Sequence, residues 1–135
     1  MAERDDDLRF YDALRSRLEH EDGLIVHRLS WFMASQSFLF TAYAIALNGP
    51  AAAARLLRLV PLVGILIAML TFAGILAALK AMAWIRASFA ARGVTEAALG
   101  LPDLLTPAPI RRFGLLGPVL LPPLFILAWA WLILR

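Results

Sequence analysis

Three long apolar runs constrain this chain more than any other feature. Residues 29–47, 60–79 and 115–134 each hold about 20 residues without a charged side chain. At a rise of about 1.5 Å per residue, a helix of that length crosses a hydrocarbon core of about 30 Å. Because lipid offers the backbone no hydrogen-bonding partners, each run is expected to be helical. The sequence therefore predicts an all-α integral membrane protein with three transmembrane helices.

The rest of the chain leaves little room for a soluble domain. Only 17% of the residues are charged and 61% are apolar, whereas a soluble domain is about a quarter charged. The predicted organisation is an N-terminal helix over 1–28, a first span over 29–47, a short outer turn over 48–59 and a second span over 60–79. A helical extension with a Pro-rich loop over 80–112 and a third span over 113–135 follow.

Positive charge is distributed unevenly along these segments. Ten of the thirteen Lys and Arg residues lie in the N-terminal segment or between the second and third runs: Arg4, Arg9, Arg15, Arg17, Arg28, Lys80, Arg86, Arg92, Arg111 and Arg112. The positive-inside rule places these two segments in the cytoplasm. The expected orientation is therefore an N-terminus in the cytoplasm, as an amphipathic helix, and a C-terminus outside.

The N-terminal helix carries a narrow apolar stripe. Tyr11, Leu14, Leu18 and Ile25 recur at spacings of three, four and seven, as in a heptad. A second stripe, formed by Met82, Ile85 and Phe89, follows the second run on the same predicted side of the membrane. The favoured interpretation is that the two stripes pack together within one chain. The alternatives are self-association of the first stripe and contact of the second with lipid headgroups.

Two charged residues continue the N-terminal stripe where apolar ones are expected. Glu21 and Arg28 lie seven residues apart, which is too far for a direct pair on one helix. Either could pair with a neighbouring helix at the membrane surface, where Arg86 and Arg92 are further candidates. The alternative is that both extend into the headgroup region.

A line of polar residues runs along the first span. At 100° per residue, Ser30, Ser37, Thr41 and Asn48 fall close to one line, flanked by Ala34 and Ala44. The opposite side carries Phe32, Leu39 and Tyr43. A small, polar face suits close packing against another helix, and it also suits the lining of a hydrated path. Packing is the favoured interpretation.

Gln36 lies away from this line, on the side of Tyr43. A buried amide needs a hydrogen-bonding partner, which predicts contact with another helix. The second span offers two weak small-residue steps, Gly64 with Ala68 and Gly74 with Ala78.

The third span contains three prolines, which predict a kink or an irregular start. They are Pro118, Pro122 and Pro123. Near its outer end, Trp129 and Trp131 are expected in an interfacial aromatic belt.

The chain lacks the motifs that carry chemistry. It has no phosphate-binding loop, zinc-protease motif or nucleophile elbow, and no cysteine. His20 and His27 lie seven residues apart, so they cannot share a metal ion unaided. No ionisable group interrupts a run, which argues against a proton-coupled transporter. We therefore expect no enzyme activity, no cofactor, no metal and no nucleic-acid binding.

One short segment resembles known sequences. The residues His27-Arg28-Leu29-Ser30-Trp31, together with 35–40 (Ser-Gln-Ser-Phe-Leu-Phe), resemble the first span of a group of small bacterial membrane proteins. The resemblance covers about 20 residues and implies a bacterial inner membrane. It implies no activity.

Two functions fit these observations. The first is a small self-assembling inner-membrane protein, whose most specific form is a homo-oligomeric channel lined by Ser30, Ser37, Thr41 and Asn48. The alternative is an accessory subunit that packs against a larger membrane protein complex. Both have the lipid bilayer as a partner.

Overall fold

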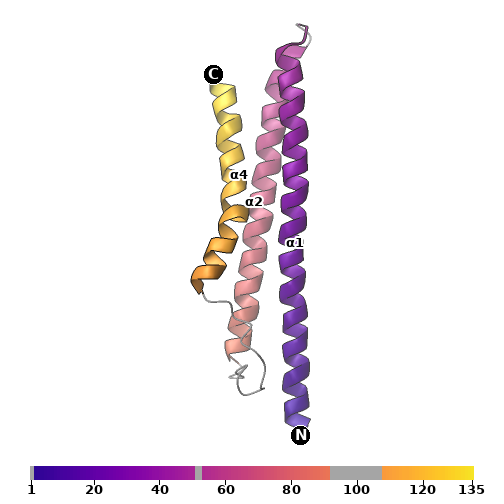
Figure 1. The fold of residues 1–135 in the computed structure, drawn as a ribbon, viewed down its shortest axis with the longest axis vertical. Helices are drawn as coiled ribbons and strands as arrows, with labels where there is room; N and C mark the ends of the chain where they lie inside the picture. Colours follow the sequence, from indigo (N-terminus) through magenta and orange to yellow (C-terminus); the bar gives the residue numbers. More distant parts are fainter. Residues whose placement is uncertain (1, 51–52, 92–107) are drawn as a thin grey trace.

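The computed structural model describes an all-helical chain. The described residues are 2–50, 53–91 and 108–135, and they form helices α1 (Ala2–Leu47), α2 (Ala54–Ala91) and α4 (Ala108–Leu134). α1 and α2 are antiparallel neighbours joined at one end, and α4 lies along α2, parallel to α1 (Figure 1). Beyond the part that α4 covers, α1 continues towards the N-terminus (Figure 1).

α1 is a single helix that joins the predicted N-terminal helix to the predicted first span. Its 46 residues correspond to about 69 Å, more than twice the thickness of a hydrocarbon core. It ends at Leu47, immediately before the Asn48-Gly49-Pro50 turn. There the Asn48 and Gly49 amides donate to the carbonyls of Ile45 and Ala46, at 3.2 Å each. These bonds tighten the last turn and satisfy carbonyls that the helix end leaves open.

The buried face of the helical hairpin repeats every three and four residues, as in a coiled coil. In α1 the buried and half-buried positions run through residues 11, 14, 18, 21, 25, 28, 32, 35, 39, 42 and 46. In α2 they run through residues 61, 64, 68, 71, 75, 78, 82 and 85. The stripe predicted for the N-terminal helix is thus the beginning of a seam that continues to the far end of α1.

The predicted packing of the N-terminal stripe within the chain is confirmed. Ile25 of α1 packs with Ala78 and Met82 of α2, and Leu18 and Leu79 complete the cluster. We call these five residues the Ile25 cluster. Tyr11 and Ile85 are buried further along the same two helices. The side chains of Phe89 and Arg92 lie outside the described residues.

Two helices are long and apolar enough to cross a membrane: Ala54–Ser88 and Gly114–Leu134. The corresponding part of α1 does not reach the same hydropathy, because Ser, Gln and Thr interrupt its apolar residues. The described residues therefore show two candidate spans by length and composition, against the three that the sequence predicts.

The three prolines of α4 do not interrupt the helix, which is continuous from Ala108 to Leu134. It bends in its N-terminal half (Figure 1), as proline is expected to cause. Pro122 is almost fully buried and Pro118 is half-buried. Both therefore lie on the inner side of α4.

Candidate functional site

Gln36 lies where the three helices meet. Its side chain is fully buried. Its Nε2 donates to the Gly64 carbonyl of α2 at 3.1 Å, and its Oε1 accepts from Trp129 Nε1 of α4 at 2.6 Å. No buried side-chain N or O atom of the described residues lacks a partner. One amide thus joins α1 to both other helices, and the partner expected from the sequence is provided twice.

Aromatic rings enclose this amide. Trp129 stacks on Phe40 with centroids 4.1 Å apart and planes inclined by 14°, and Tyr43 meets the indole edge-on at 5.8 Å. Phe125 contacts Phe32 at 5.2 Å, also edge-on. Offset and edge-to-face pairs of this kind add to the free energy of burial. The bulky side of α1 therefore packs against α4 and not against lipid.

Gly64 makes this arrangement possible. A Cβ atom at this position would lie 2.6 Å from Trp129 Cε2 and 2.8 Å from Cδ1. The indole therefore rests directly on the α2 backbone, as small residues permit at membrane helix interfaces. We call Gln36, Phe40, Gly64 and Trp129 the Gln36 site.

The sequence predicts both Trp129 and Trp131 in an interfacial aromatic belt, and this prediction is wrong for Trp129. Trp131 is 58% exposed and its ring lies beneath the Arg135 guanidinium, 5.1 Å away, as a residue at a helix end can. Trp129 is fully buried between helices. Two residues along a helix correspond to about 200°, so the two rings must point in nearly opposite directions.

The polar line of the first span faces outward. Ser30, Ser37, Thr41 and Asn48 are all exposed, and none contributes to the packing of the three helices. Each side chain donates to the carbonyl four residues before it, at 2.9 Å for the hydroxyls and 3.1 Å for Asn48. The three hydroxyl donors and one N–H of Asn48 are thus satisfied within α1, and the line remains a narrow exposed surface.

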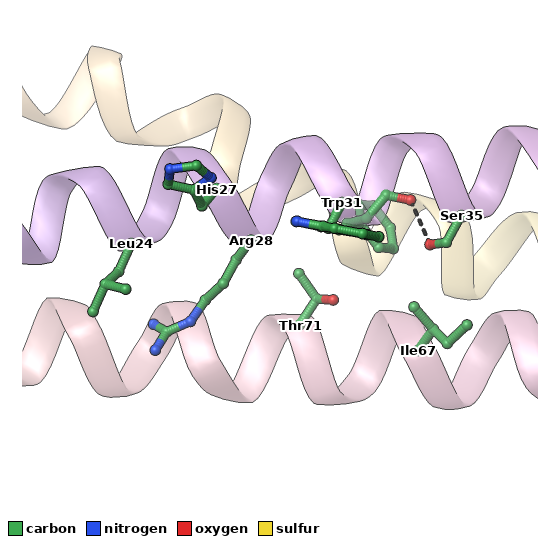
Figure 2. Close-up of a pocket in the computed structure, with 8 residues that line it drawn as sticks. Leu24, His27, Arg28, Trp31, Ser35, Ile67 and Thr71 are labelled. Atoms are coloured by element: carbon green, nitrogen blue, oxygen red, sulfur yellow. Dashed lines mark hydrogen bonds between the residues drawn. The ribbon is translucent and has the colours of Figure 1, made fainter.

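Arg28 crosses from α1 to α2 (Figure 2). Its Nη1 donates to the Gly74 carbonyl at 2.8 Å, and its Cδ and Nε lie 3.5 Å from the place where a Gly74 Cβ would stand. The predicted interhelix partner is therefore a backbone carbonyl, and among the described residues no carboxylate pairs with Arg28. Gly74 belongs to the apolar run 60–79, so Arg28 lies opposite apolar sequence.

Arg28 borders a groove of about 410 Å³ between α1 and α2. Figure 2 shows Thr71 and Ile67 reaching up from α2 towards α1. On the α1 side of the groove, Ser35 Oγ donates to the Phe32 carbonyl at 2.8 Å. The groove is lined by Leu24, His27, Arg28, Trp31, Phe32, Ser35, Ile67 and Thr71.

The other predicted charged residues lie nearer the N-terminus of α1. Glu21 is half-buried and lines a second groove, of about 290 Å³, with Arg17 and Trp84 among its neighbours. Arg86 is half-buried on α2. Arg15 donates to Glu19 at 2.9 Å, and this hydrogen bond raises the pKa of Arg15.

The two histidines are exposed and lie on separate grooves. The described residues hold no group of three His, Asp or Glu side chains able to bind a metal ion.

Sequence reasoning missed three members of the Gln36 site. Phe40 could have been found, because it lies four residues after Gln36 and three before Tyr43, on the same face. Gly64 and Trp129 carry no local signal that distinguishes them from Gly74 and Trp131.

No known protein family, curated protein or solved structure matches this chain.

Proposed function

We propose that the chain is a bacterial inner-membrane protein with three spans, α1 crossing beside α2 and α4. The support is the apolar surface that these helices expose. In water such a surface is unfavourable, whereas in lipid it is expected. The large exposed residues of α2 and α4 include Leu62, Leu66, Met69, Leu70, Leu116, Leu120, Leu124 and Leu127. The ten-to-three distribution of basic residues supports a cytoplasmic N-terminus.

We further propose that the protein assembles with itself through the outer face of α1. This face consists of Ser30, Ala34, Ser37, Thr41, Ala44 and Asn48, all exposed, at spacings of four and three residues. It lies about 200° from the seam that packs on α2. This small-residue line is the observation that carries the proposal, because small side chains let two helix backbones approach closely in a membrane.

The hydrogen bonds on this face favour a helix–helix interface over a water-filled channel. The three hydroxyls on the line, and one N–H of the Asn48 amide, already bond to carbonyls of α1 itself. A pore lining needs groups that exchange partners with water or ions, whereas a dry interface needs polar groups that are satisfied before contact. Assembly is therefore the primary role of the line, and a channel is a further form of the same proposal.

Cysteine cross-linking in native membranes tests the interface directly, since the chain has no cysteine of its own. Ser37→Cys should form disulfide-linked dimers on mild oxidation. Leu66→Cys is the matched control, because Leu66 is exposed on α2 only two residues from Gly64, the partner of Gln36. Equal cross-linking at both positions, or none at position 37, would contradict the proposal.

A second experiment separates self-assembly from an accessory role. Native mass spectrometry of the protein in mild detergent should give one discrete homo-oligomer, and Ser37→Ile should shift it towards monomer because the branched side chain holds the backbones apart. Reproducible co-purification of the monomer with an unrelated membrane subunit would instead favour the accessory role.

A further inference from the structure

We propose that the groove beside Arg28 binds an anionic phospholipid, with the headgroup phosphate on the guanidinium and an acyl chain along the groove. This inference rests on the proposed membrane location of the chain. It does not depend on self-assembly, because the groove lies between α1 and α2 of one chain and the assembly face is elsewhere on α1.

The guanidinium is held in place and has donors to spare. Arginine carries five N–H donors, and the Gly74 carbonyl accepts from one nitrogen of Arg28. The Arg28 side chain lies directly against Gly74, and this contact holds it against α2. Its Nε is 3.5 Å from the position that a Cβ atom would occupy if residue 74 had one. A guanidinium fixed at one nitrogen is suited to a bidentate contact with phosphate through the others.

The position of Arg28 creates a need for an anion. Arg28 is half-buried, directly precedes the apolar run 29–47 and bonds to Gly74, which belongs to the apolar run 60–79. Among the described residues no carboxylate pairs with it. A charge in such surroundings is costly unless it is paired. A neutral lipid headgroup carries a compensating cation of its own, whereas an anionic headgroup leaves its phosphate to Arg28.

The remaining lining indicates a lipid and not free phosphate. Leu24, Phe32 and Ile67 give the groove an apolar wall, which a free phosphate ion does not need and an acyl chain does. The exposed indole of Trp31 borders the same opening (Figure 2), and tryptophan is enriched at the level of lipid headgroups. The groove thus combines a cation with an apolar path.

Native mass spectrometry of the full chain in mild detergent tests the site. Phosphatidylglycerol and phosphatidylcholine with identical acyl chains are added in parallel, and inorganic phosphate forms a third arm. We expect one phosphatidylglycerol to be retained about tenfold better than phosphatidylcholine, with no retention of phosphate alone. Equal retention of the two lipids would overturn the proposal, and retention of phosphate alone would reduce it to an anion site.

Variants locate the lipid. Arg28→Gln should abolish the preference for phosphatidylglycerol. Arg28→Lys should keep part of it, because the ammonium retains the charge but cannot make the bidentate contact of a guanidinium. Arg17→Gln removes the same charge from another part of α1 and should keep the preference. Equal loss in Arg17→Gln would show an effect of net charge only. If Arg28→Gln does not fold, Thr71→Leu narrows the groove with Arg28 intact and should weaken binding.

Ser37→Ile distinguishes this inference from the proposed assembly. Its monomer should still retain phosphatidylglycerol, since Ser37 is not part of the groove. Loss of lipid binding in that monomer would place the lipid at the subunit interface and overturn the assignment to Arg28.

Discussion

The Ile25 cluster and the Gln36 site hold the same two helices together by different means. The Ile25 cluster uses aliphatic side chains of ordinary size from α1 and α2. The Gln36 site uses a glycine against an indole, two hydrogen bonds to one amide and a stacked ring pair. The first resembles the seam of a water-soluble coiled coil, and the second resembles a contact between membrane helices.

The proposed membrane location accounts for this difference through the surrounding solvent. Around the Ile25 cluster, where the apolar run 60–79 ends, charged residues such as Asp22 and Lys80 are exposed, so apolar burial supplies the free energy of association. Beside α4, the outer surfaces of the helices are apolar, and lipid is as apolar as leucine. Close packing and hydrogen bonds must then replace the hydrophobic effect. α1 is therefore held by apolar burial around Ile25 and by close packing and hydrogen bonds around Gln36. We call these the two packing regimes of α1.

The largest expected effect separates two glycines of α2. Gly64→Ala should destabilise the fold by about 2–3 kcal/mol, because the new methyl overlaps a fully buried indole. Gly74→Ala should be close to neutral, since its methyl meets the Arg28 side chain at an ordinary 3.5 Å. The free energy of unfolding of each variant is measured by titration with a denaturing detergent in mixed micelles. Similar losses for the two variants would show that α4 does not rest on Gly64.

The next effect is confined to the Ile25 cluster. Ile25→Ala should cost about 2 kcal/mol, at the low end for a buried isoleucine because this cluster is formed by two helices only. Hydrogen exchange should become faster in the N-terminal part of α1 and remain slow around Gln36. Val26→Ala, at a 64% exposed neighbour, should change neither. Faster exchange along the whole of α1 would contradict two independent packing regimes.

The smallest effect is the coupling between Gln36 and Trp129. A double-mutant cycle with Gln36→Leu and Trp129→Phe should give between about 0.6 and about 1.7 kcal/mol, which are the average and the maximum for hydrogen bonds between membrane helices. The same cycle with Trp131→Phe should be additive, because Trp131 is exposed and does not contact Gln36. Coupling of equal size in both cycles would contradict the bond from Trp129 Nε1.

The periodic features of the chain could be predicted because they are local. A heptad stripe, a run without charges and a turn that begins at residue 48 each follow from residues close in sequence, and helix geometry converts them into a face or an end. The same reasoning placed Ser30, Ser37, Thr41 and Asn48 on one line, and it indicated that Gln36 needs a partner. It could not say that the line faces outward, since that depends on which side of α1 the other helices occupy.

By itself, the sequence determined the helical class and the end of α1 at Leu47. It favoured packing of the N-terminal stripe within the chain, which the cluster of Leu18, Ile25 and Met82 confirms. Only the tertiary structure decided that Trp129 turns inward while Trp131 does not, that Gly64 is sterically required while Gly74 is not, and that Arg28 bonds to a carbonyl. These outcomes depend on the rotation and register of one helix against another. Rotation and register are set by contacts between residues 46 and 93 positions apart, and no local period encodes them.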